Sequence, residues 1–312
     1  MTESVPAIEV AGLTKRYGSP QGDLLAVDHI DLTVRRGEVF GFLGPNGAGK
    51  TTTIRMLTGL ARPTAGQARV LGLALGRDMS RIKKQIGVVP EASNLYDELT
   101  AFDNLIFSMR LFGVPRTERA RRADALLDRF RLADGRDVPF ARLSRGMKRA
   151  LTIAAALAHR PEIVFLDEPT TGLDVVNARG LRGTIAGLHG EGVTVFLTTH
   201  YLEEAERLCD RIALLVGGKI VALDTVDGLK MQVQEMTAVE VTLEGGPNGV
   251  EIRHIASQDI ETAARAALAE AEREGRRVLA INTIRPTLED AFVRLTGLSA
   301  DVMRLEKGGK GR

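Results

Sequence analysis

A nine-residue segment limits what this chain can fold into more than any other part of the sequence. It consists of Gly44, Pro45, Asn46, Gly47, Ala48, Gly49, Lys50, Thr51 and Thr52, and it fits the pattern G-x-x-x-x-G-K-[ST]. The apolar run before it, residues 38–43, predicts a buried strand, and residues 53–60 after it have the spacing of a helix. This strand–loop–helix context distinguishes a phosphate-binding loop from an ordinary glycine-rich turn.

The residue types in this segment explain how it would bind phosphate. Glycines let the backbone curl so that successive N–H groups point at phosphate oxygens, and the N-terminus of the following helix adds positive charge. Lys50 is expected to reach the β- and γ-phosphates, and the hydroxyl group of Thr51 is expected to hold Mg²⁺. The segment therefore predicts a protein that binds a nucleoside triphosphate.

The bulk composition narrows the remaining classes. The chain has 312 residues, 44% hydrophobic and 26% charged, which is typical of a globular protein with one large domain or two unequal ones. Lys and Arg number 42 against 40 Asp and Glu, so the net charge is +2 and we expect no nucleic-acid partner. The single cysteine, Cys209, excludes an intramolecular disulfide, and its helical spacing with Leu202 and Ala205 predicts a buried thiol in a reducing cytosol.

The sequence predicts neither a signal peptide nor a membrane span. The first residues lack the basic-then-apolar pattern of a signal peptide. The longest apolar runs, residues 150–158 and 212–223, are too short to cross a bilayer. If the protein works at a membrane, we therefore expect a partner to hold it there.

Apolar strands alternate with helical segments over most of the chain. Short runs at residues 163–166, 193–197 and 212–216 predict buried strands, and residues 7–10 and 30–34 predict two more near the start. Buried strands separated by helices are typical of a parallel sheet that is covered on both faces. The sequence therefore predicts an α/β core.

A helical insertion is expected to interrupt this core between about residues 92 and 155. Within residues 121–132 the apolar side chains recur at helical spacing, and residues 92–142 contain no convincing strand.

Near residue 229 the pattern changes to a small α+β module. Residues 238–244 and 278–284 predict strands, residues 260–271 predict a helix, and Thr287 begins a capping box before another helix. The expected division is an α/β domain at residues 1–228, the α+β module at residues 229–305 and a disordered tail at residues 306–312.

Two carboxylates follow the strand at residues 163–166. Asp167 is expected to complete the Mg²⁺ coordination that Thr51 begins, and Glu168 is expected to polarise an attacking water as a general base. An acid pair at a strand end is as often a cap or a salt-bridge site, so the pair alone decides nothing. It becomes specific beside three further features: the segment Leu143-Ser144-Arg145-Gly146-Met147, the segment Gly172-Leu173-Asp174, and His200 after the next strand.

Taken in this order, the segments resemble the nucleotide-binding subunit of an ABC transporter, from about residue 7 to residue 228. The resemblance implies a P-loop NTPase fold with an ABC-type core sheet, ATP as substrate and Mg²⁺ as cofactor. It implies that Tyr17 stacks on adenine and that Asp174 lies in a loop connecting the two active sites of a dimer. His200 would contact the γ-phosphate and orient the water, although an isolated histidine is more often structural.

The segment around Ser144 and Gly146 matches the family's signature. It precedes a predicted helix, whose N-terminal N–H groups form an anion site. The resemblance implies that this site faces the γ-phosphate held by a second copy, so that ATP joins two copies into a sandwich homodimer that hydrolysis opens.

Three positions, in two segments, depart from the family's pattern. Arg145 and Met147 stand where the family usually has glycine and glutamine, and Glu91 replaces a glutamine. A Glu91 oxygen can still bind Mg²⁺ or hold water, but it adds negative charge beside Asp167 and Glu168. Metal affinity, hydrolysis rate or coupling to a membrane partner could therefore differ from the family's usual behaviour.

Residues 284–297 resemble the C-terminal extension of the drug-exporter type in the ABC-2 branch. This resemblance implies a separate integral-membrane permease, with the ATPase on the cytoplasmic face of the cell membrane. The helical insertion would form the docking surface, with Tyr96, Leu99 and Phe102 as candidate contacts or, equally, as core residues of the insertion. The transported substrate is not readable from this chain.

Two other classes of protein share the phosphate loop. A soluble ABC ATPase acting on ribosomes or DNA is the alternative, but such proteins carry two cassettes or long coiled coils, and this chain shows one cassette and no heptad run. A metabolic kinase or GTPase would lack the signature segment and the histidine that follows the next strand.

Overall fold

The computed structural model describes residues 5–18, 22–233, 237–245, 249–257, 259–284 and 286–304. It groups the chain into two compact units, one containing Met1–Thr225 and Ser299–Arg312, the other Val226–Leu298. The tail predicted to be disordered, residues 306–312, lies outside the described residues.

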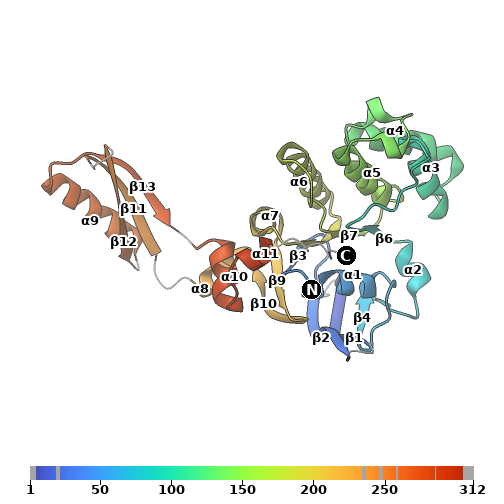
Figure 1. Cartoon of the computed structure of the whole chain (residues 1–312), viewed down its shortest axis with the longest axis horizontal. Helices are drawn as coiled ribbons and strands as arrows, with labels where there is room; N and C mark the ends of the chain where they lie inside the picture. Colours follow the sequence, from blue (N-terminus) through green and yellow to red (C-terminus); the bar gives the residue numbers. More distant parts are fainter. Residues whose placement is uncertain are drawn as a thin grey trace. The chain divides into compact units, whose positions relative to one another are not determined.

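A six-stranded sheet forms the centre of the first unit (Figure 1). Five strands run parallel, and β10 pairs antiparallel with β9 at one edge. Their spatial order is β10 (Lys219–Thr225), β9 (Arg211–Val216), β3 (Val39–Leu43), β8 (Thr194–Thr199), β7 (Ile163–Asp167) and β6 (Ile86–Val89). The predicted α/β fold with a parallel sheet is confirmed.

Aromatic packing holds the middle of this sheet together. Phe196 on β8 lies 5.6 Å from Phe40 and 5.3 Å from Phe42 on β3, between ring centroids. The ring of Phe165 on β7 lies 5.5 Å away on the opposite side of β8. All four rings are fully buried, which explains why these strands are apolar throughout instead of alternating.

Helices pack against these strands within the same unit. The pairs in contact are α1 (Lys50–Leu57) with β7, α5 (Arg145–Leu157) with β6, α6 (Val175–Gly190) with β8 and α7 (Leu202–Leu208) with β3. Helix α1 begins at Lys50 and ends at Leu57, three residues earlier at both ends than the sequence pattern predicts. The phosphate loop therefore leads into the helix without any spacer.

A four-stranded antiparallel sheet, in the order β2-β1-β4-β5, completes the first unit. It consists of β1 (Ile8–Tyr17), β2 (Leu24–Val34), β4 (Ala65–Val70) and β5 (Leu73–Ala74). The strands predicted at residues 7–10 and 30–34 are parts of β1 and β2, which are both longer than predicted. The sequence pattern did not predict β4 and β5. Both sheets share one core, in which Ile8 and Val70 pack with Phe42 and Met56.

The helical insertion lies between β6 and β7. It contains α3 (Ala101–Leu111), α4 (Arg116–Arg129), two short 3-10 turns (Ala133–Gly135 and Phe140–Arg142) and α5. Helix α4 ends at Arg129, whereas the apolar spacing predicted a helix through Leu132; the backbone turns to a positive φ of 56° at Arg131. A five-residue helix, α2 (Met79–Lys83), precedes β6.

The second unit contains a three-stranded antiparallel sheet in the order β12-β11-β13. The strands are β11 (Thr237–Glu244), β12 (Val250–Ser257) and β13 (Val278–Ile284), of which the sequence pattern did not predict β12. Helix α9 (Ile260–Arg273) places Ala263, Ala267 and Ala271 against Val239, Val241 and Leu243 of the central strand.

Two further helices of this unit, α8 (Val226–Val233) and α10 (Leu288–Thr296), pack on each other. The predicted capping box is present: Thr287 accepts a hydrogen bond from the Asp290 N–H, and the Asp290 side chain accepts one from the Thr287 N–H. A last short helix, α11 (Asp301–Arg304), is grouped with the first unit.

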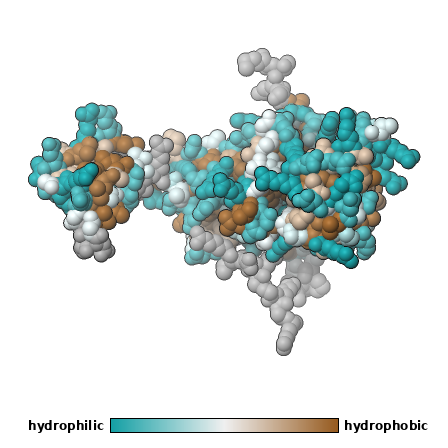
Figure 2. All heavy atoms as spheres, turned by 90° about the horizontal axis from the view of Figure 1, so that it is seen from above, coloured by the Kyte–Doolittle hydropathy of each residue, from teal (hydrophilic) through white to brown (hydrophobic). Residues whose placement is uncertain are grey.

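No helix within the described part of the chain is both long enough and apolar enough to cross a bilayer. The surface seen in Figure 2 is mostly hydrophilic, with separate hydrophobic patches between the charged side chains.

Candidate nucleotide-binding and catalytic site

The phosphate loop joins the end of β3 to the start of α1 and is clamped from two sides. A Cβ atom on Gly44 would lie 2.2 Å from the Leu215 carbonyl oxygen, and one on Gly49 would lie 2.4 Å from the Ala26 carbonyl oxygen. Gly49 also has a φ of 107°, which side chains rarely tolerate. Only glycine fits at either position, so the curl of this loop is fixed by β9 and β2 on its two sides.

The side chain of Lys50 lies inside this curl and is 6% exposed. Its Nζ donates hydrogen bonds to the carbonyl oxygens of Gly44, at 2.6 Å, and Pro45, at 3.3 Å. The same Nζ lies 3.3 Å from Oε1 of Glu168. The structure therefore places one buried positive charge between the phosphate loop and the acid pair.

Side-chain oxygen atoms from three segments meet at Asp167, the last residue of β7. Its Oδ1 accepts hydrogen bonds from the hydroxyl groups of Thr198, at 2.7 Å, and Thr51, at 3.3 Å. Burial raises the pKa of Asp167 above its usual value, although the two threonine hydroxyls act in the opposite direction. A neighbouring hydroxyl and carboxylate are the hard oxygen ligands that Mg²⁺ prefers.

These oxygens fit a metal that also needs ligands from its substrate. Within the described residues, no group of three or more His, Cys, Asp or Glu side chains could hold a metal ion. Mg²⁺ typically takes only one or two protein ligands and completes its shell with phosphates and water. Glu91, the third predicted metal ligand, is exposed, and its charge contributes to raising the pKa of Asp167.

Glu168 is held in an unusual backbone conformation beside Asp167. Its φ is 49°, and its N–H donates to the Thr198 carbonyl oxygen at 3.1 Å. Oε2 of Glu168 lies 2.7 Å from Nδ1 of His200, while Oε1 is the oxygen paired with Lys50. The strained backbone points this carboxylate between a histidine and a lysine, which is typical of a functional site.

The surroundings of Glu168 keep it ionised although it is only 8% exposed. Burial by itself raises the pKa of this carboxyl, but the hydrogen bond with His200 and the charge of Lys50 outweigh burial, so the pKa lies below its usual value. A buried, ionised carboxylate with an open hydrogen-bonding capacity can accept a proton from water.

The signature residues form a second cluster with Asp174. Ser144 is the N-cap of α5 and accepts a hydrogen bond from the Met147 N–H at 3.3 Å. Asp174 is the N-cap of α6, and its Oδ2 accepts a hydrogen bond from the Asn177 side-chain amide at 2.6 Å. That amide lies so close to Gly146 that a Cβ there would be 2.5 Å from Asn177 Cγ.

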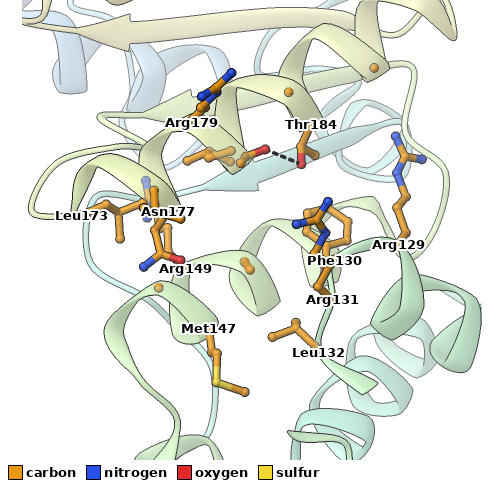
Figure 3. Close-up of a pocket in the computed structure, with 17 residues that line it drawn as sticks. Arg129, Phe130, Arg131, Leu132, Met147, Arg149, Leu173, Asn177, Arg179 and Thr184 are labelled. Atoms are coloured by element: carbon orange, nitrogen blue, oxygen red, sulfur yellow. Dashed lines mark hydrogen bonds between the residues drawn. The ribbon is translucent and has the colours of Figure 1, made fainter. Parts of the chain in front are cut away.

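The substitution at Arg145 extends the same cluster. The Arg145 guanidinium covers Gly172, where a Cβ atom would lie 1.8 Å from a guanidinium nitrogen. The start of α5 thus contacts the loop before α6 at two points, Arg145 with Gly172 and Gly146 with Asn177. A cavity of about 690 Å³ opens beside this contact, with Leu173 and Asn177 on one side and Arg129 and Arg131 on the other (Figure 3).

Tyr17 lies at the end of β1 and is 37% exposed, with the Lys15 Nζ 4.8 Å from its ring centroid. The strand pair that carries it reaches the phosphate loop through Ala26 on β2. This arrangement is compatible with the predicted role of Tyr17 in base stacking, which stays a prediction.

Arg149, which the sequence pattern does not single out, links the helical insertion to the catalytic strand. Arg149 is 9% exposed. Its guanidinium donates to the carbonyl oxygens of Pro90 and Glu91 after β6, and to those of Asp167, Glu168 and Pro169 at the end of β7. Burial lowers the pKa of Arg149 to about 10. An arginine directly before the apolar run of residues 150–158 is the available signal, and it does not reveal the partners.

Comparison with known proteins decides the family. Residues 27–171 match the ABC transporter family. The daunorubicin/doxorubicin resistance ATP-binding protein DrrA of Streptomyces peucetius is 35% identical over 99% of this chain and 98% of its own length. The chain belongs to the ATP-binding proteins of ABC transporters.

Other relatives of this ABC chain agree. The linearmycin resistance ATP-binding protein LnrL of Bacillus subtilis (strain 168) is 34% identical over 93% of this chain and 98% of its own length. A solved dimer of an ATP-binding cassette in a post-hydrolysis state, bound to ADP and Pi, superposes with a TM-score of 0.66 at 26% identity, covering 70% of this chain and 98% of that one. The P-loop NTPase fold and the class of ATP hydrolase are thereby confirmed.

Replacing Arg149 in this ABC protein should weaken both stability and catalysis. We expect Arg149→Met to lower the melting temperature, because each buried carbonyl left without a donor costs about 1–3 kcal/mol, and to lower ATP hydrolysis because Asp167 and Glu168 lose their support. Arg149→Lys should recover only part of either, since one ammonium cannot reproduce the planar fork.

Thermal denaturation and phosphate release would be measured side by side, with Arg121→Met, at an exposed arginine of α4, as the control. Wild-type stability and turnover in Arg149→Lys would show that the fork geometry is not needed.

Proposed function

We propose that this chain is the ATPase subunit of an ABC-2 type exporter, and that it binds ATP with Mg²⁺ at the phosphate loop, Thr51 and Asp167. The observation that carries this proposal is the ionised Glu168, held between Lys50 and His200 at the end of the central sheet. Drug-resistance and Nod factor export proteins are among the relatives, which supports export over action on ribosomes or DNA.

The residues of one site account for the chemistry of hydrolysis. Lys50 binds the γ-phosphate, and Mg²⁺, when bound by Thr51 and Asp167, supplies further charge neutralisation. Glu168 accepts the proton of the attacking water while His200, hydrogen-bonded to Glu168, orients that water. The oxygen of the water bonds to the γ-phosphorus, the bond to the β–γ bridging oxygen breaks, and ADP and phosphate result.

A complete site requires a second copy of the chain. Ser144 and the first N–H groups of α5 form an anion site. Asp174 and Asn177 beside it form hydrogen bonds with each other. In the proposed sandwich, this cluster binds the γ-phosphate held by the partner copy. Loss of the γ-phosphate removes the shared ligand, and the pair opens.

An apolar groove between the helical insertion and the core suits the permease. It has a volume of about 430 Å³, and its exposed apolar side chains are Leu60 (68% exposed), Tyr96 (50%), Leu111 (69%) and Phe112 (38%). Pro90, directly before Glu91, also lines it, so a docked protein would contact the loop that Arg149 supports. Large exposed apolar side chains gathered in one groove mark an interaction site.

Two of the three docking residues expected from the sequence lie elsewhere. Tyr96 lines the groove, whereas the ring of Phe102 lies under the Arg136 guanidinium, 3.8 Å from its carbon, and Leu99 is half-buried with its carbonyl bonded to the Phe140 N–H. We propose that this groove contacts the permease at the cytoplasmic face of the membrane. The identity of the cargo is a property of that permease.

Substitutions at Lys50 and Glu168 should separate binding from hydrolysis. We expect Lys50→Ala to abolish ATP binding, and Glu168→Gln to bind ATP and remain dimeric while hydrolysis falls by about 10²–10⁴-fold, the usual contribution of a general base. Nucleotide binding, phosphate release and mass by light scattering in the presence of ATP measure the three effects. Glu203→Gln, an exposed carboxylate on α7, serves as control; normal turnover by Glu168→Gln would remove Glu168 from its role.

A charge placed in the groove should prevent docking. We expect Leu111→Glu to abolish co-purification with any polytopic membrane protein that the unsubstituted chain retains, because docking would bury the new carboxylate without a partner. The experiment uses the ATP-trapped Glu168→Gln background, with quantitative mass spectrometry of the membrane fraction. Leu268→Glu on α9, where the leucine is 47% exposed, should co-purify normally; equal recovery of both variants would exclude the groove as the contact.

A further inference from the structure

We propose that Glu204 is a positioning residue for ATP hydrolysis, whose buried carboxyl group fixes Thr170 and Thr199 and thereby sets Glu168 against His200. This inference rests on the proposed roles of Glu168 and His200. Nothing in the sequence pattern singles out Glu204, which lies in an acidic stretch of α7 beside the exposed Glu203 and the half-buried Glu206.

A single oxygen atom of Glu204 joins two catalytic segments. The side chain is 3% exposed, and its Oε2 accepts hydrogen bonds from the hydroxyl groups of Thr170, at 2.8 Å, and Thr199, at 3.0 Å. Thr170 lies two residues after Glu168, and Thr199 directly precedes His200. Glu204 therefore ties the loop after β7 to the end of β8 at the point where each carries its functional side chain.

Further hydrogen bonds close this link into a ring. The Thr199 hydroxyl oxygen also accepts from the Tyr201 N–H at 3.0 Å, so the backbone is held on both sides of His200. His200 in turn lies 2.7 Å from Glu168, and Thr171 donates to the same Glu168 oxygen at 3.4 Å. The orientation of His200 relative to Glu168 thus depends on Glu204 through bonds on both strands.

The other oxygen of Glu204 shows that this arrangement is not optimal for stability. Among the described residues Oε1 is buried and has no hydrogen-bond partner. Burial raises the pKa of this carboxyl, against the effect of the two threonine hydroxyls. A buried polar oxygen without a partner costs stability, and an apolar side chain of the same length would avoid that cost. The hydrogen bonds that Oε2 of Glu204 accepts from Thr170 and Thr199 offer a reason for a carboxyl group at this buried position.

The expected effect follows from how steeply catalysis depends on geometry. A displacement of about 1 Å at a reacting group can lower a rate about 100-fold, and loss of an orienting hydrogen bond behind a functional side chain typically costs about 10- to 100-fold. Glu204 does not touch the nucleotide, so its loss should leave ATP affinity intact.

The test compares Glu204→Met with Glu204→Gln in the full chain. We expect Met, which has similar length but no acceptor, to lower kcat about 10- to 100-fold with KM for ATP and the melting temperature unchanged. Gln keeps one acceptor oxygen and should restore most of kcat. Glu203→Met and Glu203→Gln, on the exposed neighbour in the same helix, are the matched controls.

A second pair of variants keeps the inference testable if Glu204→Met does not fold. Thr170→Val removes the hydrogen bond to Glu204, and Thr199→Val removes both the bond to Glu204 and the one accepted from the Tyr201 N–H. Neither substitution changes side-chain volume much, and each should lower kcat without changing KM for ATP. When either valine substitution is combined with Glu204→Gln, the losses of kcat should be non-additive. Both threonine hydroxyls donate to the same oxygen of Glu204, so the three residues act together.

Wild-type kcat in Glu204→Met and in both valine variants would overturn the inference, as would a parallel fall of kcat, ATP affinity and melting temperature that Gln does not rescue. Glu168→Gln is measured in the same assay to separate the two proposals. If Glu168→Gln is inactive and Glu204→Met is active, only this inference fails; if Glu168→Gln turns over normally, the proposed function fails as well.

Discussion

The position of β8 between β3 and β7 is the constraint on which the site depends. Parallel strands deliver their carboxyl ends to one edge of a sheet, and these three strands end in the phosphate loop, in Thr199 before His200, and in the acid pair. Thr198 on the middle strand forms hydrogen bonds with Asp167 and with the backbone of Glu168. This strand therefore sets the distance between the phosphate loop and the two carboxylates. The packing of Phe196 against rings on both neighbouring strands stabilises this order.

Buried polar side chains connect this edge to the rest of the first unit. Arg149 brings the signature helix into contact with the carbonyl groups of the catalytic strand, and Glu204 connects the two loops that carry Glu168 and His200. Both are buried; Arg149 donates hydrogen bonds to backbone carbonyl groups, and Glu204 accepts them from two threonine hydroxyls. A movement of α5 toward a partner's nucleotide would therefore change the surroundings of Asp167 and Glu168 directly.

Local sequence patterns predicted those parts of the site that consist of residues close together in the sequence. The phosphate loop, the acid pair after an apolar run, and the position of Ser144 before a helix all depend on spacing within a few positions. Strand order is not local: β7 precedes β8 in the chain but lies beyond it in the sheet, so the contact of Thr198 with Asp167 could not be foreseen. Arg149 and Glu204 were missed for the same reason, because their partners lie 18 to 59 and 5 to 34 positions away. In the second unit, β12 was not predicted, because the alternation of apolar and charged residues covers only residues 250–253 and ends at His254.

The most direct test of the account asks whether one active site is built from two copies. Lys50→Ala removes the phosphate-loop lysine, and Ser144→Arg blocks the signature anion site, so each variant alone should hydrolyse no ATP. A mixed pair, however, contains one site with both Lys50 and Ser144 intact. Phosphate release by an equimolar mixture of the two inactive variants is the measurement. The account predicts that activity returns on mixing; a mixture as inactive as its parents, or Ser144→Arg active by itself, would contradict it.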